Sequence, residues 1–370
     1  MEPRRSLLVQ GDCLDVMRAL EDRLCQSLRM IYIDPPFFSG TDYTLKKKGS
    51  GSQTAAPSLE DIRTYSDKWT GGLQGYLDYF RPRLLMMRSL LRPDGCIWVH
   101  LDWHICHYMK VLLDETFGYG CFVNEIIWKR TNSPKGQSNA FGSQHDVILL
   151  YARDRRKFVL RPVFRDHDER SLVPYSYRDE RGLFRLIEIE AQGIQRSQDR
   201  RQFEWRGRTA PYLYSAQTLD RWADEGLIYR SRNGRYSKKQ YLSDSDGVPV
   251  SDLWMDIPPL QGSSSEYLGF VTQKPEPLLS RMISCATDEG DLVADFFCGS
   301  GTTAVVAERL HRRWIACDIS ETAIELTVRR LREFARCEYA LERINERSQS
   351  DDTRDDLSSY SQVDSVRPTR

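Results

Sequence analysis

A glycine-rich stretch decides the fold of this chain, and it reads Phe297-Cys298-Gly299-Ser300-Gly301-Thr302-Thr303-Ala304. Residues 292–297 form an apolar run that predicts a β-strand, and residues 302–311 carry the apolar spacing of a helix. Glycines in such a turn let the backbone approach a ligand closely, and the N-terminus of the helix favours an anionic group. Asp318 lies at the end of the next predicted strand, 314–319, where a carboxylate can accept hydrogen bonds from ribose hydroxyls.

Besides a loop that binds a ligand containing a ribose, two other interpretations of this stretch are open. Its spacing, Gly299-x-Gly301-x-x-Ala304, fits the fingerprint of dinucleotide-binding proteins, so a nicotinamide or flavin enzyme is a rival. A tight turn between strand and helix that binds no ligand is the other interpretation. Residues outside the stretch are needed to decide between them.

Strands and helices alternate along much of the chain. Apolar runs predict strands at residues 7–9, 30–33, 96–101, 126–128, 147–151, 292–297 and 314–319. Helical spacing is found at residues 13–28, 76–91, 103–117, 278–283, 302–311 and from 320 to about 339. This alternation predicts an α/β protein with a parallel sheet.

The net charge of the chain is zero, with 53 Lys+Arg and 53 Asp+Glu in 370 residues, but the charge is unevenly distributed. Residues 155–255 hold 20 Lys+Arg against 15 Asp+Glu, and arginines alternate with aromatic residues at 203–208. This segment interrupts the α/β pattern and indicates an insertion. Because the local field governs binding to a polyanion, the neutral total does not exclude nucleic acid. The predicted segments are 1–153, 154–255, 256–338 and a polar tail, 339–370, expected to be disordered.

The composition is that of a globular protein rather than a fibrous, disordered or small disulfide-stabilised one. Nine cysteines contain no CxxC pair and no zinc-like spacing, so we expect reduced thiols, no metal site and a cytoplasmic location. No run of about 18 apolar residues is present, and we therefore expect no membrane span.

A second motif, Asp34-Pro35-Pro36-Phe37, follows the strand predicted at 30–33. Ligand sites in open α/β sheets lie beyond the carboxyl ends of strands, and two prolines fix the backbone there. The Asp34 carboxylate and the Pro35 carbonyl could accept both hydrogen bonds of an exocyclic amine, while the base stacks on Phe37. A proline-rich turn in which Asp34 caps the backbone is the alternative.

The two motifs occur together with a third, which reads Thr272-Gln273-Lys274-Pro275-Glu276-Pro277-Leu278-Leu279. This combination resembles the amino-group DNA methyltransferases that use S-adenosylmethionine. Residues 34–37 look like their catalytic motif, residues 295–303 like their donor loop, and residues 10–14 like the segment near the donor adenine. The catalytic motif comes first, as in the family's β group and in type III-like modification enzymes. The resemblance covers roughly 7–151 and 256–335.

The resemblance implies a Rossmann-like methyltransferase sheet with a circularly permuted motif order. Residues 1–153 would form its catalytic half, residues 256–338 its donor-binding half, and residues 154–255 an inserted α+β target-recognition region. The implied cofactor is S-adenosylmethionine, and the implied substrate is double-stranded DNA in a prokaryotic cytoplasm. A separate restriction subunit or enzyme is an implied partner, and a homodimer is left open.

The resemblance also assigns roles to individual residues. The catalytic set is Asp34, Pro35, Pro36 and Phe37. The cofactor-binding set is Asp12, Cys13, Lys274, Phe297, Gly299, Ser300, Gly301, Thr302 and Asp318. Backbone amides of the glycine-rich stretch would hold the methionine portion, and Asp318 the ribose. Asp12 with the Cys13 backbone would hold the adenine, and Lys274 the donor carboxylate unless it is an exposed lysine at a helix start.

Several alternatives stay open. Aspartate at position 34 favours adenine N6 as the target, because the cytosine N4 enzymes more often carry serine there. An RNA or protein-glutamine methyltransferase and a DNA-binding module without catalysis are further alternatives. The insertion favours a reader of duplex DNA, and the intact motifs argue against a module without catalysis. A dinucleotide enzyme is disfavoured because too little chain follows Asp318 for a second mononucleotide half. Candidate DNA contacts lie at 46–48, 129–130 and 196–241.

Overall fold

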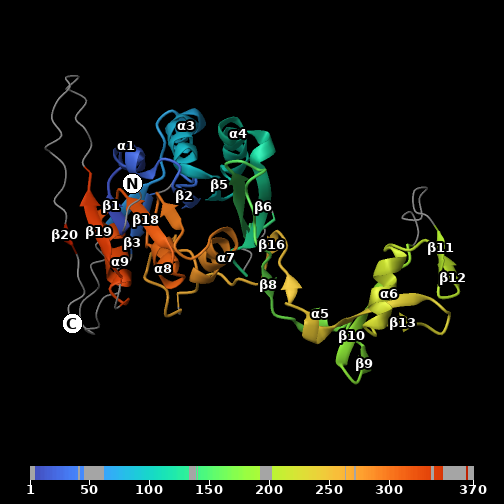
Figure 1. Cartoon of the computed structure of the whole chain (residues 1–370). Helices are drawn as coiled ribbons and strands as arrows, with labels where there is room; N and C mark the ends of the chain where they lie inside the picture. The colour runs from blue at the N-terminus through green and yellow to red at the C-terminus, as the bar shows by residue number, and fades with distance from the viewer. Residues whose placement is uncertain are drawn as a thin grey trace, which may run out of the picture. The chain divides into compact units, whose positions relative to one another are not determined.

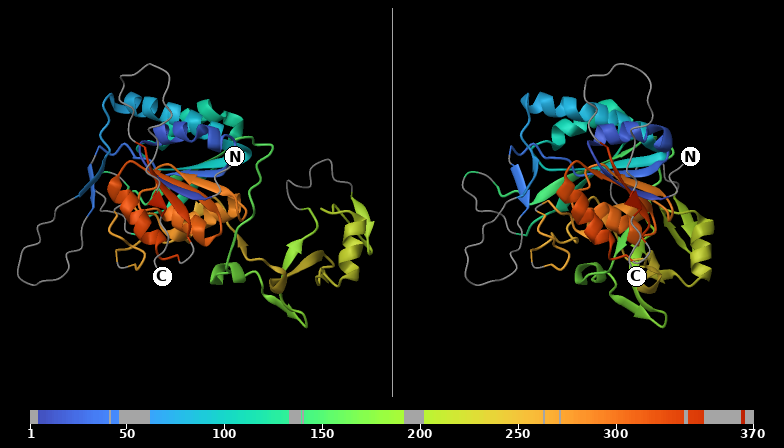
Figure 2. Two further views of the ribbon diagram at one scale, coloured as in Figure 1. Left: turned by 60° about the vertical axis from the view of Figure 1, so that its left-hand side comes forward. Right: turned by 90° about the vertical axis from the view of Figure 1, so that its left-hand side faces the viewer.

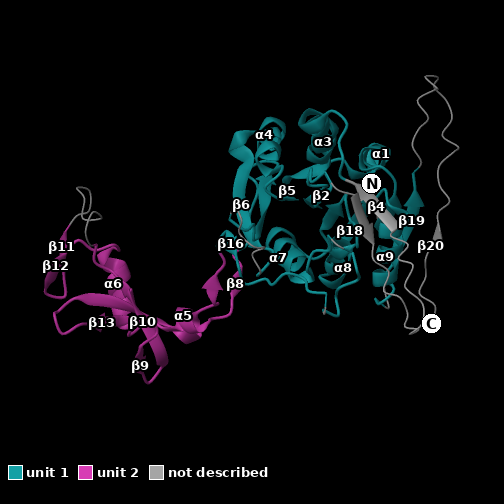
Figure 3. Ribbon diagram, turned by 180° about the vertical axis from the view of Figure 1, so that it is seen from behind, with its two compact units in different colours: residues 1–161, 251–370 teal, residues 162–250 magenta. Residues whose placement is uncertain are grey.

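The computed structural model of the whole chain, shown in Figure 1, contains two compact units. It describes residues 5–40, 42–45, 62–132, 139, 141–191, 202–262, 264–270, 272–334, 337–344 and 364–365. Unit 1 comprises Met1–Arg161 and Ser251–Arg370, and unit 2 comprises Pro162–Val250 (Figure 3). The insertion predicted at 154–255 therefore contains a compact unit that begins and ends a few residues inside those limits. The candidate DNA contact at 46–48 lies outside the described residues.

Unit 1 is built on one large sheet. Its strands are β1 (Ser6–Gln10), β2 (Leu28–Ile33), β5 (Leu91–Leu101), β6 (Phe122–Lys129), β7 (His145–Ala152), β16 (Leu253–Trp254), β17 (Leu292–Asp295), β18 (Arg313–Asp318), β19 (Tyr339–Arg343) and β20 (Asp364–Ser365). Their order is β16-β6-β7-β5-β2-β17-β18-β1-β19-β20. The strands from β5 to β19 in this order are parallel, and β7 runs antiparallel between β5 and β6. The predicted Rossmann-like methyltransferase sheet is thereby confirmed.

Helices cover both faces of this sheet (Figure 2). One face carries α1 (Cys13–Ala19), α2 (Glu21–Leu24), α3 (Gly72–Leu90) and α4 (Cys106–Phe117), with the short helix η1 (Tyr119–Cys121) after α4. The other face carries α7 (Glu276–Ala286), α8 (Thr302–Arg309) and α9 (Glu321–Leu331). A small hairpin is formed by β3 (Asp42–Leu45) and β4 (Ile62–Ser66). Burial on both faces explains why the parallel strands are continuous apolar runs rather than alternating ones.

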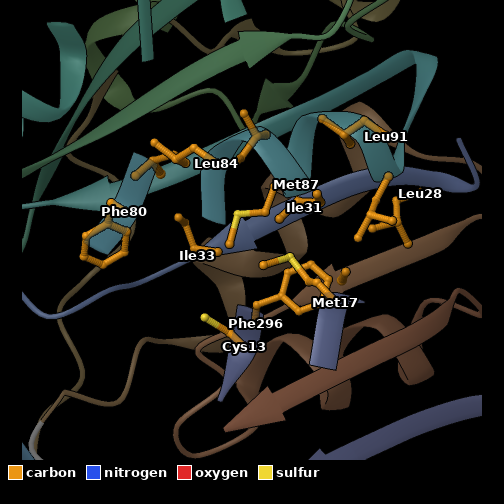
Figure 4. Packing of buried hydrophobic residues seen from close by; sticks show 14 of the residues in the cluster. Cys13, Met17, Leu28, Ile31, Ile33, Phe80, Leu84, Met87, Leu91 and Phe296 are labelled. Atoms are coloured by element: carbon orange, nitrogen blue, oxygen red, sulfur yellow. The ribbon is translucent and has the colours of Figure 1, made fainter. Parts of the chain in front are cut away.

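The core of unit 1 lies between α1, α3 and the sheet (Figure 4). Phe80, Leu84 and Met87 recur at helical spacing on α3, and each is fully buried. They pack in one cluster with Ile31 and other side chains of the parallel strands. Phe296 joins the same cluster, so the residue directly before the glycine-rich stretch contributes to core packing.

Three boundaries in unit 1 differ from the prediction. The helix predicted at 13–28 is two helices, α1 and α2, and the one predicted to about 339 ends at Leu331. The segment predicted to be a disordered tail, 339–370, contains two short strands among its described residues, β19 (Tyr339–Arg343) beside β1 and β20 (Asp364–Ser365) beside β19. The strand β19 carries a glutamate and an arginine, and its apolar signal is too short to recognise in sequence.

Unit 2 has the mixed α+β composition expected of the insertion. Its elements are β8 (Phe164–Arg165), α5 (Glu169–Leu172), β9 (Tyr177–Asp179), β10 (Gly182–Glu188), β11 (Phe203–Trp205), β12 (Arg208–Ala210), α6 (Ala216–Asp224), β13 (Ile228–Arg230), β14 (Tyr236–Tyr241), η3 (Leu242–Asp244) and β15 (Val248–Pro249). The antiparallel order β13-β14-β10-β9 forms its main sheet. Its core gathers Trp205, Tyr212, Leu219 and Trp222. The aromatic residues that alternate with arginines in sequence are therefore partly structural.

Candidate active site

Two loops leave neighbouring parallel strands of unit 1 at the same edge of the sheet. β2 pairs with β17, and Tyr32 lies opposite Asp295 in the register. The chain continues from β2 toward β5 on one side and from β17 toward β18 on the other, so this edge is a topological switch point. A cavity of about 330 Å³ opens there, lined by both loops and by the segment before α7. We refer to it as the central cavity.

The loop after β2 is held by groups that are distant in sequence. Phe38 adopts a left-handed backbone conformation with φ of 62°, which is unusual for a residue with a side chain. The buried carboxylate of Asp67 accepts hydrogen bonds from the Phe38 amide (3.0 Å) and the Ser39 amide (2.6 Å). The Tyr76 hydroxyl donates to the carbonyl of Pro36 at 2.7 Å. These bonds fix the turn and engage Pro36 rather than the Pro35 carbonyl predicted to face a substrate.

Phe37 rests on a buried polar network. Its ring stacks on His100, with ring centroids 6.2 Å apart and planes inclined by 27°. The His100 ring is fully buried between the Tyr32 hydroxyl (3.1 Å) and an Asp146 carboxylate oxygen (3.1 Å). Burial raises the pKa of Asp146, but the hydrogen bond to His100 and nearby positive charges outweigh it and lower that pKa overall. Both ring nitrogens of His100 are occupied, so the orientation of the ring beneath Phe37 is fixed.

Asp34, in the loop after β2, forms an ion pair with Lys274, which lies in the segment before α7. The Lys274 ammonium donates to Asp34 Oδ2 and to the Thr272 carbonyl (3.3 Å). It also lies 5.2 Å from the centroid of the Phe37 ring. Among the described residues, Asp34 Oδ1 is buried and has no hydrogen-bond partner. One oxygen of Asp34 is thus anchored, and the other is an unused acceptor beside the central cavity.

The loop after β17 uses its own backbone amides internally. The amides and their acceptors are Phe297 to Asp295 Oδ1 (3.0 Å), Cys298 to the Cys317 carbonyl (2.9 Å), Gly299 to Asp318 Oδ2 (2.8 Å) and Gly301 to the Cys298 carbonyl (2.8 Å). Because the amides of Gly299 and Gly301 already have acceptors within the protein, their contact with the methionine portion of a donor stays a prediction. This pattern also opposes a dinucleotide, whose pyrophosphate needs several outward-facing amides.

Comparison with known proteins gives the family. The model of the N6/N4 DNA methylase family matches residues 28–329, which include both loops and the segment before α7. The chain belongs to the N6/N4 DNA methylase family.

The chain is similar to several individual proteins. The type II methyltransferase M.EcaI of Enterobacter cloacae is 30% identical over 306 residues, covering 82% of this chain and 64% of that protein. The StyLTI Mod subunit, from a type III restriction-modification enzyme of Salmonella typhimurium, is 26% identical over 349 residues, covering 87% and 54%. The chain thus spans between about half and two thirds of the length of these relatives. The putative DNA modification methylase TTHA0409 of Thermus thermophilus superposes with a TM-score of 0.48 at 14% identity, covering 92% and 100%.

The structure brings most of the predicted site residues of this chain together. Those that line the central cavity are Asp34, Pro36, Lys274, Phe297, Gly299, Ser300, Thr302 and Asp318. Pro35 and Phe37 adjoin it in the same loop, and Gly301 lies at the N-terminus of α8. Lining residues to which the sequence assigned no role are Tyr32, Trp69, Tyr79, Phe270, Gln273 and Asp295. Gln273 and Asp295 had a sequence signal, because they lie within the motifs at 272–279 and 295–303.

Asp12 and Cys13 bond to groups of α1 and α3, and one of these, the Tyr79 hydroxyl that donates to Asp12 at 3.5 Å, belongs to a residue that lines the central cavity. Asp12 caps α1 by accepting from the Leu14 amide at 2.8 Å, and it pairs with Arg83 at 2.7 Å. Cys13 is buried beneath Arg83, and burial raises the pKa of its thiol to about 12. Neither residue is among the described residues that line the central cavity. Contact with a donor adenine stays a prediction for this pair.

A buried arginine that the sequence did not reveal braces the glycine-rich loop. Arg330 of α9 donates to the Ser300 carbonyl and to Thr302 Oγ1, each at 2.9 Å. Its second terminal nitrogen donates to Glu276 at 2.8 Å. The Thr302 hydroxyl in turn donates to the Lys274 carbonyl at 3.3 Å. Arg330 therefore links the glycine-rich loop, α7 and α9 into one unit.

Gly301 is required by both conformation and space, which gives a testable expectation. Its φ is 74°, and a Cβ at this position would lie 2.6 Å from Cγ2 of the buried Thr327. Left-handed strain and the clash together should make Gly301→Ala lower the free energy of unfolding by about 3 kcal/mol. Gly290 is the matched control, since its φ is 81° but a Cβ added there would meet nothing within 4 Å. Gly290→Ala should cost only about 1 kcal/mol; equal losses in urea denaturation would contradict the clash.

Asp295 should make the stability of this protein depend on pH. Burial is the main cause that raises the pKa of its carboxyl to about 7, with a smaller contribution from Asp34 and Asp318. A carboxyl whose pKa is raised on folding stabilises the protein fully below its unfolded pKa. That contribution disappears as the pH rises toward 7.

The measurement compares urea denaturation of wild type and Asp295→Asn between pH 4 and 8. Asparagine keeps the hydrogen bond from the Phe297 amide and can donate to Thr303. Relative to the variant, wild type should lose on the order of 4 kcal/mol of unfolding free energy across this range. Asp22→Asn, at an exposed position of α2, should show no such trend. A pH-independent difference for Asp295→Asn would contradict the raised pKa.

Two further features are absent from the described part of the chain. None of its helices is both long enough and apolar enough to cross a membrane. Its His, Cys, Asp and Glu side chains include no group of three or more that could hold a metal ion.

Proposed function

We propose that this chain transfers a methyl group from S-adenosylmethionine to the exocyclic amine of a base in double-stranded DNA, with adenine N6 favoured. The observation that carries the proposal is the unused oxygen of Asp34. Buried polar groups in folded proteins nearly always have hydrogen-bond partners, so a buried acceptor beside a cavity calls for a donor from a ligand. The N–H of an exocyclic amine is such a donor.

The charge of the central cavity supports S-adenosylmethionine rather than a dinucleotide. Its lining includes the Asp318 carboxyl group and the Asp34–Lys274 ion pair, in which Lys274 is the single described cation of the lining; Asp295, with a pKa of about 7, is only partly charged near neutral pH. S-adenosylmethionine carries a sulfonium and an ammonium against one carboxylate, so its positive charge complements this lining. A pyrophosphate would be repelled by it. Asp318 would hold the ribose, since each carboxylate oxygen that accepts a backbone amide can accept a second hydrogen bond.

The cofactor supplies an electrophilic methyl group, and the loop after β2 prepares the nucleophile. Asp34 Oδ1 and the Pro35 carbonyl would accept the two N–H bonds of the amine, which draws its lone pair out of conjugation with the ring. Phe37 would stack on the flipped base and offset part of the cost of removing it from the duplex. Asp67 and Tyr76 keep this loop rigid, so that most of the rate gain comes from positioning and electrostatics.

DNA binding is assigned to exposed basic side chains of unit 2. Arg206, Arg230, Arg232 and Arg235 are exposed within the predicted segment 196–241, of which 196–201 lies outside the described residues. Arg208 is instead committed to Glu190 through two hydrogen bonds of 2.7 and 3.0 Å. Exposed arginines of this kind contact phosphates and make binding depend strongly on salt. Such contacts hold the duplex in place without reading its sequence.

A restriction subunit is the proposed partner. The StyLTI relative is a Mod subunit of a type III restriction-modification enzyme, and this chain matches about half of its length. We extend this likeness to the present chain as a modification component, which would act on DNA in a prokaryotic cytoplasm. Co-purification with a nuclease encoded beside it would support this part of the proposal.

The test is transfer of a radiolabelled methyl group from S-adenosylmethionine, with duplex DNA, RNA and protein offered in separate reactions. Label in duplex DNA alone is expected, and digestion to nucleosides should give N6-methyladenine. Label recovered as N4-methylcytosine would overturn the preference for adenine but keep the reaction class. Label only in RNA or protein would overturn the substrate, and no label with any acceptor would overturn the proposed activity.

A further inference from the structure

Lys274 contacts the loop after β2, although the two are far apart in the sequence. It precedes α7, whereas Asp34 follows β2, and 240 positions separate the two residues. Their side chains are largely buried, with exposed fractions of 10% for Lys274 and 14% for Asp34. Because buried charges are rarely found without a partner, the pair is a fixed feature of the site.

The backbone that carries Lys274 is held on both sides. The buried side chain of Gln273 accepts from the Leu268 amide at 3.0 Å and donates to the Glu266 carbonyl at 2.7 Å. The carbonyl of Lys274 accepts from Thr302, which is itself bonded to Arg330. The ammonium therefore reaches Asp34 from a rigid support.

We infer that Lys274 is a positioning residue for the methyl acceptor rather than a ligand of the donor carboxylate. It holds Oδ2 of Asp34 and thereby turns Oδ1, which has no partner among the described residues, toward the amine of the target base. If Lys274 turned instead to a donor carboxylate, Oδ2 would lose its partner as well, and neither oxygen of the largely buried Asp34 carboxylate would have one among the described residues, which is strongly unfavourable. This inference rests on the proposed function.

The primary test separates donor binding from methyl transfer in Lys274→Met. Isothermal titration of S-adenosylmethionine, without DNA, should give a Kd within about twofold of wild type. The kcat for DNA methylation should fall by at least about 10²-fold, because Asp34 is no longer oriented. Lys274→Arg, which can still donate to Asp34, should recover part of kcat, whereas a residue with a merely structural role would show no such rescue. Thermal melting checks that both variants fold.

Asp318→Asn is the control for donor binding and should weaken the Kd for S-adenosylmethionine by about tenfold or more. A comparable loss of affinity in Lys274→Met would overturn the inference and leave the proposed function standing. An unchanged kcat in Lys274→Met would also overturn it. Absence of S-adenosylmethionine binding by wild type would instead overturn the proposed function.

Asp34→Asn provides a second route that does not depend on the folding of Lys274→Met. This variant weakens the ion pair but keeps Lys274 in place. If Lys274 positions Asp34, the Kd for S-adenosylmethionine should stay within about twofold of wild type. If Lys274 were a donor ligand held back by Asp34, the Kd should tighten by about fivefold or more, and that result would overturn the inference.

Discussion

Replacing Asp34 with alanine should lower kcat for DNA methylation by at least about 10³-fold while DNA is still bound. The variant loses the buried Oδ1 that we assign to the amine, and no other described carboxylate occupies the loop between Pro35 and Ser39. The loop itself should persist, because Asp67 and Tyr76 hold it through bonds that do not involve Asp34. Single-turnover methylation and a fluorescence assay of DNA binding would measure the two effects separately.

Asp34→Asn is the matched variant for this experiment. It keeps an oxygen acceptor of nearly the same shape but removes the charge, so we expect a smaller loss, of about 10- to 10²-fold. We expect kcat to decrease from wild type to Asp34→Asn and again to Asp34→Ala. The Kd for DNA should not follow this order. If alanine retained more than about a tenth of wild-type kcat, the assignment of Asp34 to the reacting amine would fail.

The sequence located the two loops because each directly follows a strongly apolar strand. Parallel strands place such loops at one edge of a sheet, so Asp34 and Gly299 could be assigned to one site without a structure. The same reasoning could not predict which acceptors bind the backbone amides of the glycine-rich loop. Their acceptors include Asp318 and the Cys317 carbonyl, which belong to the next strand.

The residues that support the site escaped notice because their contacts join distant parts of the chain. Asp67 lies beyond a long polar segment, and nothing in its neighbours marks it as the partner of Phe38. His100 is embedded in the apolar run of β5, where a buried histidine has no distinct pattern. Lys274 was recognised as part of a motif, but the side chain that it pairs with could be found only from the structure.

Replacing Arg330 with alanine should lower the free energy of unfolding by about 3–5 kcal/mol, the largest stability effect that we expect from the loss of a buried charge. The guanidinium is 6% exposed and satisfies the Ser300 carbonyl, Thr302 and Glu276 together. Burial lowers the pKa of Arg330, and the charge of Glu276 opposes that effect. Its removal leaves a buried carbonyl and a carboxylate without these donors. Urea denaturation of both proteins at neutral pH measures the difference.

Arg329→Ala is the matched control, since Arg329 is the less buried neighbour of Arg330 on α9. It should change the free energy of unfolding by no more than about 0.5 kcal/mol. Because Arg330 joins the glycine-rich loop to α7, its loss should also weaken S-adenosylmethionine binding, which Arg329→Ala should not do. If Arg330→Ala and Arg329→Ala were equally stable, the glycine-rich loop would be held by the hydrogen bonds of its backbone amides alone. A destabilised Arg330→Ala that keeps wild-type affinity would confine Arg330 to packing and remove it from the support of the donor site.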